Sequence, residues 1–240
     1  MIPGSLAANL KTLIVSFEVV VPRFPRLVVP NYPHHVTQRG VRRQTTFFDN
    51  DDYSAYLRLA AELLDQADVK IWAYCLMPNH VHAIVVPATS EGLTKFFAPL
   101  HRQYARRTNS RHEWRGHLWQ ERFYSVVMDE THTLSAMRYV ERNPVRAGLC
   151  DTPQDWPWSS TRGNLELAID PLVDRGHTRD VISNWCMYLG AEENDVELEL
   201  FRRQTLSGRP EGDPEFVKRV ELLSGRQVRR KRPGRKPKIG

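Results

Sequence analysis

The stretch Met77-Pro78-Asn79-His80-Val81-His82-Ala83-Ile84-Val85-Val86 decides the fold that this sequence predicts. Its proline and asparagine are typical turn residues, and the apolar, β-branched residues that follow favour a strand. Side chains two positions apart on a strand point to the same face of a sheet. His80 and His82 therefore share a face, and two imidazoles suit manganese, zinc and other transition ions better than magnesium alone. Histidines that are merely tolerated at a sheet edge are the alternative interpretation.

The segments on both sides of this turn alternate between strand and helix patterns. Apolar and alternating runs predict strands, and apolar residues at helical spacing predict helices. The strands are expected over residues 34–38, 69–76, 80–86 and 123–128, and the helices over 50–67, 91–108 and 131–142. The order β-α-β-β-α-β and then a helix is that of a ferredoxin-like, RNA-recognition-like split βαβ fold. The predicted fold class is α+β, with helices on one face of an antiparallel sheet and the other face free for a ligand.

Composition divides the chain into four parts. We expect an N-terminal extension over 1–22, a main domain over 23–165, a helical C-terminal extension over 166–225 and a disordered basic tail over 226–240. The extension contains a strand-like run, Leu13 to Val21. It is either a further strand or sequence upstream of the true start. We favour the second interpretation and expect residues 1–21 to be dispensable. Short helices are predicted over 178–204 and 213–224.

The positive charge is concentrated in the tail. The chain has 34 basic and 28 acidic residues, a net charge of +6, and eight of the basic residues lie in the tail with no acid among them. Such a block is usually solvated and often binds an anionic polymer such as DNA. An inert tail is the alternative. Arg232 to Lys238 loosely resembles a hook that binds the minor groove.

Composition also limits the surroundings in which the chain works. No stretch is long and apolar enough to predict a membrane span. Cys75, Cys150 and Cys186 are odd in number and widely spaced, which argues against both a disulfide framework and a cysteine-based zinc site. A reducing compartment, the cytoplasm, is therefore the expected location.

Further candidate residues follow the histidines. Tyr139 and Asn143 are four positions apart, so on one helix they share a face. Tyrosine can act as a nucleophile and asparagine can add an oxygen ligand, although an ordinary helix residue and a helix-end cap explain them equally. Between 112 and 125, basic and aromatic residues interleave, as in segments that hold phosphates and stack on unpaired bases. A core position is the alternative for Trp119.

Five ordered motifs together resemble a known family, the single-tyrosine HUH transposases, in which HUH denotes histidine, a bulky apolar residue and histidine. Within it the chain is most similar to the REP-associated tyrosine transposases, over about residues 23–162. The motifs are Pro33-His34-His35-Val36-Thr37-Gln38-Arg39-Gly40, Met77-Pro78-Asn79-His80-Val81-His82, Gly116-His117-Leu118-Trp119-Gln120-Glu121-Arg122-Phe123-Tyr124-Ser125, Tyr139-Val140-Glu141-Arg142-Asn143-Pro144-Val145-Arg146-Ala147-Gly148 and Trp156-Pro157-Trp158-Ser159-Ser160.

The resemblance implies a site and a reaction. His80 and His82 match the metal-binding pair, and Asn143 falls where relatives place a third polar ligand, glutamine in some of them. Tyr139 matches the tyrosine that attacks a DNA phosphate and becomes linked to the 5′ end. Tyr104 and Tyr124 are rivals that do not occupy the matching position. The implied cofactor is Mg²⁺ or Mn²⁺.

The implied partner is single-stranded or hairpin DNA, namely repetitive extragenic palindromes, with no membrane or small-molecule substrate. A monomer or homodimer associated with the nucleoid is expected. The residues expected to contact DNA are Gln38, Arg39, Arg42, Arg102, Arg106, Trp119, Arg122, Arg229, Arg230, Lys231, Arg232 and Arg235. One alternative is a domesticated regulator that binds hairpins without cutting. Another is an HUH replication initiator or relaxase, which predicts a helicase or primase region that these 240 residues lack.

Overall fold

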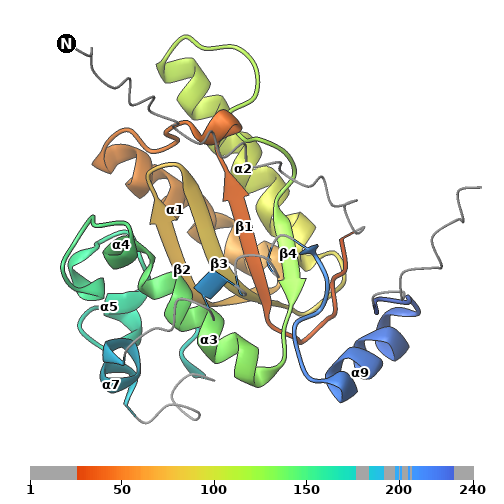
Figure 1. Ribbon diagram of the computed structural model, residues 1–240. Coiled ribbons are helices and arrows are strands. Elements are labelled where there is room, and N and C mark those ends of the chain that lie inside the picture. The colour runs from red at the N-terminus through yellow and green to blue at the C-terminus, as the bar shows by residue number, and fades with distance from the viewer. Residues whose placement is uncertain are drawn as a thin grey trace, which may run out of the picture.

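The computed structural model describes residues 26–176, 184–191, 198–199, 201, 205 and 207–229. Their centre is a four-stranded antiparallel sheet in the order β2-β3-β1-β4, shown in Figure 1. The strands are β1 (His34–Arg39), β2 (Val69–Met77), β3 (His80–Pro87) and β4 (Tyr124–Val127). The predicted α+β class with a split βαβ arrangement is confirmed.

Two long helices cover one face of the sheet. They are α1 (Asn50–Ala67) and α2 (Gly92–Arg111). Side chains from both helices, among them Tyr56 and Phe96, join Val36, Val81 and Val85 of the strands in one buried cluster. The α1 helix begins where predicted because the side chain of Asp49 accepts a hydrogen bond from the backbone N–H of Asp52, which caps the helix N-terminus.

A third helix, α3 (Glu130–Glu141), covers the opposite face. Its apolar side chains, Ala136, Met137 and Val140, are fully buried in a second cluster with Cys75 and Ile84 of the sheet. The sequence predicted helices on one face only, and the structure differs in this detail. The reason is that the residues of β2 and β3 that point to this face are themselves apolar, so they bury surface against α3.

The C-terminal part packs beside both outer strands. Its elements are α4 (Asn143–Arg146), the 3₁₀ turn η2 (Pro153–Asp155), α5 (Thr161–Asn164), α7 (Trp185–Gly190) and α9 (Pro214–Ser224). Ser159 and Val173 form single bridges to β2, and Glu211 forms one to Met128 at the end of β4. The helix predicted over 213–224 is α9. Of the helix predicted over 178–204, the described residues contain α7.

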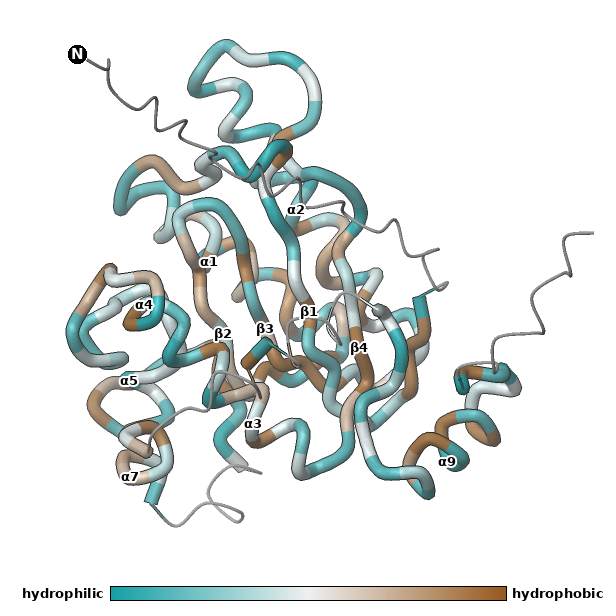
Figure 2. The backbone as a smooth tube through the Cα atoms, viewed as in Figure 1, coloured by the Kyte–Doolittle hydropathy of each residue, from teal (hydrophilic) through white to brown (hydrophobic). Residues whose placement is uncertain are grey.

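The first residues of the predicted tail belong to the packed structure. Val228 is only 2% exposed and joins Phe216 and Val220 of α9 in a third apolar cluster. Figure 2 shows the hydrophobic stripe along α9. The guanidinium of Arg226 donates to the carbonyl of Arg26 at 2.9 Å. The predicted tail boundary at 226 is therefore wrong, because burial of Val228 fixes the chain to that point. Residues 1–25 and 230–240 lie outside the described residues.

Membrane insertion is not indicated by any described helix. In that part of the chain, no helix combines the length and the apolar character that a membrane span requires.

Candidate active site

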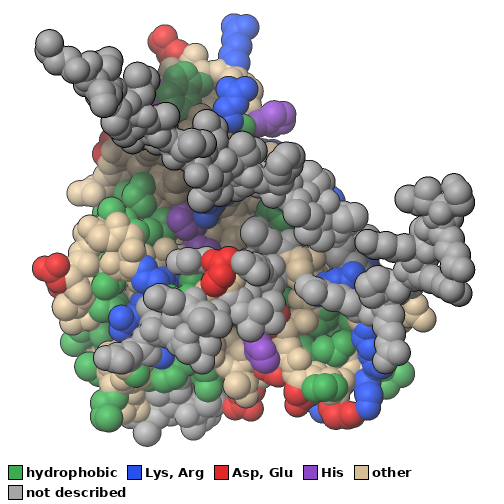
Figure 3. Space-filling view, in the orientation of Figure 1, with side chains coloured by type: hydrophobic (Ala, Val, Ile, Leu, Met, Phe, Trp, Pro, Cys, Tyr) green, Lys and Arg blue, Asp and Glu red, His purple; other side chains and the backbone are tan. Residues whose placement is uncertain are grey.

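His80 and His82 open strand β3 and share the face that α3 covers. Their ring centroids lie 4.8 Å apart with the ring planes at 81°. Figure 3 shows histidine and basic side chains near the middle of this face. The structure therefore brings the two predicted metal ligands together, as their spacing required.

One nitrogen of each ring is already engaged. The Nδ1 atom of His82 lies 2.9 Å from Nε2 of His35, and Nδ1 of His80 lies 2.6 Å from Oδ1 of Asn79. The side-chain amide of Asn79 donates to the carbonyl of Arg43, which turns its oxygen toward His80. The Nε2 atoms of His80 and His82 make no hydrogen bond within the described residues. This leaves one nitrogen per ring for a metal ion.

Burial keeps these histidines neutral. Desolvation lowers the pKa of His80 to about 3, with the charge of Arg39 acting in the same direction. Desolvation, followed by the neighbouring His80 and His35, lowers the pKa of His82 well below its usual value. Neutral imidazole is the form that binds metal ions, so the donor set fits one.

Asn143 lies just beyond α3, as the first residue of α4. The helical hydrogen bonding continues through this point, since the N–H of Ala147 donates to the carbonyl of Asn143. The Nδ2 atom of the Asn143 side chain is buried and has no hydrogen-bond partner among the described residues. In the same part of the chain, no three His, Cys, Asp or Glu side chains are placed to hold a metal ion. A metal at His80 and His82 would therefore need other oxygens, for which the side-chain amide of Asn143 is a candidate.

Tyr139 lies on α3 against the histidines. Its ring centroid is 5.8 Å from that of His82 and 6.4 Å from that of His35, in edge-on contacts. The guanidinium carbon of Arg146 lies 4.1 Å from the ring centroid, and Arg146 also donates to the Tyr139 carbonyl. The ring of Phe201 packs against that of Tyr139 in a tilted arrangement, with 4.6 Å between the ring centroids. The Tyr139 hydroxyl makes no hydrogen bond with the described residues.

The two rival tyrosines differ in position. Tyr104 is fully buried between α1, α2 and the sheet, and its hydroxyl donates to the carbonyl of Thr46 at 2.7 Å. Tyr124 pairs with Thr37, and Thr37 pairs with His82, so Tyr124 lies on the same sheet face as the histidines. The structure therefore removes Tyr104 from the site and leaves Tyr124 as the rival to test.

Arg39 places a positive charge beside the pair. It is the cross-strand partner of His80 and is partly buried. No hydrogen bond or ion pair joins its guanidinium to the described residues. Partial desolvation and the charge of Arg43 lower the pKa of Arg39, while the nearby Tyr139 raises it. A partly buried guanidinium that has no partner in the described part of the chain suits a bound phosphate.

Two residues expected to contact DNA are buried on the other side of the sheet. The side-chain amide of Gln38 donates to the carbonyl of Glu121 at 2.8 Å, and the indole of Trp119 donates to the carbonyl of His101 at 3.0 Å. Both residues are at least 91% buried, so neither side chain is exposed for contact with a DNA base. For Trp119 the structure supports the core interpretation.

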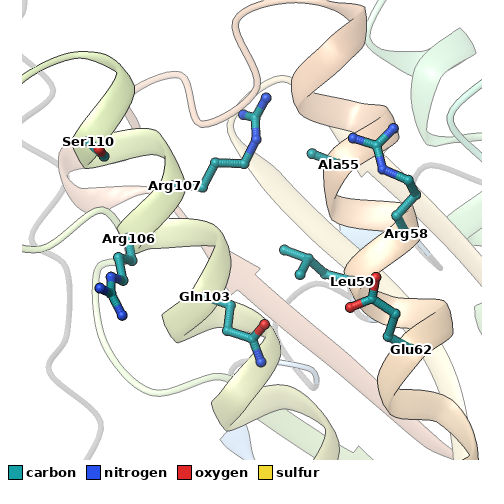
Figure 4. A pocket seen from close by; sticks show the side chains of 8 residues that line it. All are labelled: Ala55, Arg58, Leu59, Glu62, Gln103, Arg106, Arg107 and Ser110. Carbon is teal, nitrogen blue, oxygen red and sulfur yellow. The ribbon is translucent and has the colours of Figure 1, made fainter.

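The predicted arginines scatter over the surface. Arg102 and Arg106 lie on α2, across the sheet from His82. Arg106 lines a groove of about 490 Å³ between α1 and α2, with Arg58, Glu62 and Gln103, as Figure 4 shows. Arg42 and Arg122 are exposed near the end of β1, and Arg229 forms an ion pair with Glu221 at 3.1 Å. Arg230, Lys231, Arg232 and Arg235 lie outside the described residues.

Several side chains around the two histidines and Tyr139 were not predicted as site residues. His35 and Asn79 hydrogen-bond His82 and His80, Arg146 lies over the Tyr139 ring, and Phe201 and Thr205 reach the site from the C-terminal extension. Strand alternation offered a signal for His35, because it is two positions from Thr37, the partner of His82. Nothing in the sequence pattern pointed to Thr205.

Comparison with known proteins gives matches of three kinds. Residues 28–143 match the family model described as "Transposase IS200 like". A curated protein of Haemophilus influenzae, named as a REP-associated tyrosine transposase, is 24% identical over 147 residues, which are 57% of this chain and 81% of the relative. A solved structure of a REP-associated tyrosine transposase bound to a REP hairpin aligns with a TM-score of 0.50. Its identity is 19%, and the alignment covers 65% of this chain and 92% of that one. The family resemblance predicted from the sequence is confirmed.

Proposed function

From the match of residues 28–143 to the family model "Transposase IS200 like", we propose that this protein cuts and rejoins single-stranded DNA with Tyr139 as its nucleophile. The observation that carries the proposal is the contact between Tyr139 and His82. It puts a phenol and two imidazole Nε2 atoms side by side, none of them hydrogen-bonded within the described residues. Phosphoryl transfer requires the nucleophile to be held beside the groups that orient the phosphate, which is the arrangement of Tyr139 and the two histidines.

The proposed reaction begins at the Tyr139 hydroxyl. The Tyr139 oxygen attacks a phosphorus atom of the DNA backbone and loses its proton to water. An oxygen–phosphorus bond forms, and the bond from phosphorus to the 3′ oxygen breaks. The 3′ oxygen takes a proton from water and leaves as a hydroxyl, and the 5′ phosphate stays on the Tyr139 oxygen. Attack by a 3′ hydroxyl reverses these steps and rejoins the strand without an external energy source.

His80, His82 and Asn143 are the residues that would hold a divalent metal ion, Mg²⁺ or Mn²⁺. When bound there, such an ion withdraws charge from the phosphate oxygens and orients the phosphate. Arg39 supports the same task from β1. Its guanidinium has no hydrogen-bond or ion-pair partner among the described residues, neighbours His80, and can donate two hydrogen bonds to a phosphate.

We propose hairpin DNA of the repetitive extragenic palindrome type as the substrate. The support is the similarity to a REP-associated relative and to a structure that holds a REP hairpin. Tyr139 is only partly exposed and packs against Phe201 and Arg146. An unpaired strand can bend into such a position more easily than a stacked duplex, whose unstacking costs energy.

The deciding experiment is a cleavage assay on a labelled hairpin flanked by single strands. With Mn²⁺ or Mg²⁺, the protein should form a covalent adduct that survives denaturing electrophoresis, and EDTA should abolish it. Hairpin binding without an adduct under any metal would support the non-cleaving regulator instead. An adduct that persists in EDTA would refute the metal-binding part of the proposal and retain the nucleophile.

A further inference from the structure

Thr205 reaches the site from the C-terminal extension and has one proton to donate. Its hydroxyl lies 2.9 Å from the carbonyl oxygen of Phe201, which can only accept. The same oxygen lies 3.3 Å from Nδ1 of His35. Since the hydroxyl proton is used on the carbonyl, the oxygen must accept at its contact with His35. The proton of the His35 ring therefore sits on Nδ1.

The second contact of His35 follows from the first. A neutral imidazole carries one proton, so His35 with a protonated Nδ1 has a lone pair on Nε2. His35 is only 1% exposed, and burial disfavours the charged form of an imidazole, so the ring is neutral. The Nε2 lone pair then accepts a hydrogen bond from Nδ1 of His82, 2.9 Å away.

The ring geometry agrees with this bond. The planes of His35 and His82 differ by 15° and their centroids are 5.1 Å apart. With nitrogens only 2.9 Å apart, so large a centroid distance means that the rings meet edge to edge. Ring N–H groups and lone pairs both lie in the ring plane, so this is the orientation a hydrogen bond needs.

From this chain of contacts we propose that His35 and Thr205 are positioning residues that fix the tautomer of His82. The hydrogen bonds link the Phe201 carbonyl to Thr205, Thr205 to His35, and His35 to His82. They keep the proton of His82 on Nδ1 and leave the Nε2 lone pair for a metal ion. Asn79 sets the same tautomer on His80 by accepting from its Nδ1. The role in metal binding rests on the proposed function; the tautomer itself does not.

Hydrogen bonds that run in the opposite direction, from Thr205 to His35 to His82, would leave His82 unable to bind a metal ion through Nε2. If Thr205 donated to His35, then His35 would donate to His82, and His82 would carry its proton on Nε2. A ring in that state cannot bind a metal through Nε2 without first moving the proton. Partners that hold a ligating histidine in the correct tautomer typically change metal affinity by about 10- to 100-fold.

The tautomer is tested directly by nitrogen-15 NMR of the histidine rings in the metal-free protein. Wild type and Thr205→Ser should show His82 protonated on Nδ1, because serine keeps the hydroxyl. Thr205→Val should shift the His82 signals toward a mixture of tautomers. Thr108→Val is the matched control, since the buried Thr108 hydroxyl donates to the carbonyl of Tyr104 in the same way on α2. A His82 ring protonated on Nε2 in wild type would overturn the proposal.

Metal affinity is the second test, measured by titrating Mn²⁺ alone into the DNA-free protein in a calorimeter. His35→Phe should weaken binding about 10- to 100-fold, and His35→Gln should recover part of it, because its side-chain oxygen can accept from His82. Equal affinity in wild type and a folded His35→Phe protein would overturn the positioning role. Absence of Mn²⁺ binding in wild type would instead refute the metal site of the proposed function and leave the tautomer result standing.

Discussion

At the scale of single residues, the nucleophile is the first assignment to test. Tyr139→Phe removes only the phenol oxygen and keeps the ring contacts with His82 and Phe201. We expect the covalent adduct to disappear and hairpin affinity to stay. Tyr124→Phe, on the same sheet face, should keep the adduct and is the matched control. Loss of the adduct in Tyr124→Phe alone would reverse the assignment.

The two histidines of β3 give the second prediction. His80→Ala and His82→Ala should each abolish metal-dependent cleavage, because each removes one of two imidazole donors. His101→Ala serves as the comparison, since it also deletes a buried histidine, one that hydrogen-bonds Tyr56 on the other side of the sheet. That variant should lower stability but retain cleavage per folded molecule. Stability is read by thermal melting and activity by adduct formation.

Glu211 should make stability depend on pH. It is 97% buried, and neither carboxylate oxygen has a hydrogen-bond partner among the described residues. Burial, with Asp129 nearby, raises its pKa from 4.5 to about 8. The folded state thus holds a proton that the unfolded chain releases near pH 4.5, so the free energy of unfolding falls as pH rises from about 4.5 to about 8.

Glu211→Gln should reduce that dependence. The slope attributable to one such proton is at most about 1.4 kcal/mol per pH unit. Denaturant unfolding from pH 5 to 9 measures it, with Glu215→Gln on the exposed surface of α9 as the control. An unchanged slope in Glu211→Gln would show that the carboxylate finds a partner or solvent in solution. Glu141, whose pKa burial raises to about 7, contributes a similar slope in both proteins.

Residue-scale prediction from sequence was strongest where spacing alone fixes geometry. Strand alternation placed His80 and His82 on one face, because a pleat leaves no alternative. The structural role of Trp119 was not decidable, since an aromatic residue beside arginines fits both a core and a base-stacking surface. The role of Thr205 could not be predicted, because its contact with His35 joins residues that are far apart in sequence.

At the scale of elements, Glu141 connects α3 to the C-terminal extension. One carboxylate oxygen accepts from Ser160 and Asn164, and the other accepts from the Trp185 indole, each at 2.6 Å. Glu141→Gln keeps one acceptor oxygen but replaces the other with an NH₂ group, which faces a hydrogen-bond donor and cannot accept from it. We expect a loss of about 1–3 kcal/mol in the free energy of unfolding, the usual cost of an unsatisfied buried polar group. Glu130→Gln, at the exposed start of α3, should be nearly neutral in the same denaturant titration.

Long elements were predictable and short ones were not. The bounds of α1 agree with the prediction because a capping aspartate and a full apolar stripe mark them. The helix expected over 131–142 corresponds to α3, but the turn continues into α4 at Asn143. Four-residue helices such as α4 and α5 carry no periodic pattern. They form because tertiary contacts hold them.

At the scale of the whole molecule, the basic tail should act through phosphate charge. Deleting residues 230–240 removes six Lys or Arg and spares the packed Val228. We expect weaker DNA binding on cognate and scrambled hairpins alike and a flatter dependence on salt, because fewer counterions are released. The melting temperature should not change, whereas deletion from 226 should lower it. Loss of affinity for the cognate hairpin alone would mean that the tail reads sequence.

The layered architecture was predictable only in part. The element order gave the sheet and the layer formed by α1 and α2, since consecutive elements pack in a small number of ways. The covered second face was not foreseen, because it depends on α3 and on α7, which join the sheet through the second apolar cluster. A count of apolar strand residues on each face would have indicated it.

The bridges beside the two outer strands bear on how far the molecule can be shortened. Ser159 and Val173 line the free side of β2, and Glu211 lines that of β4, where its N–H and carbonyl both bond to the strand end. All three lie beyond the family-matched part, which ends at residue 143. A fragment cut there would present two rows of unpaired backbone groups, each a template for joining another chain edge to edge. Aggregation, rather than a small autonomous nuclease, is the expected fate of that fragment.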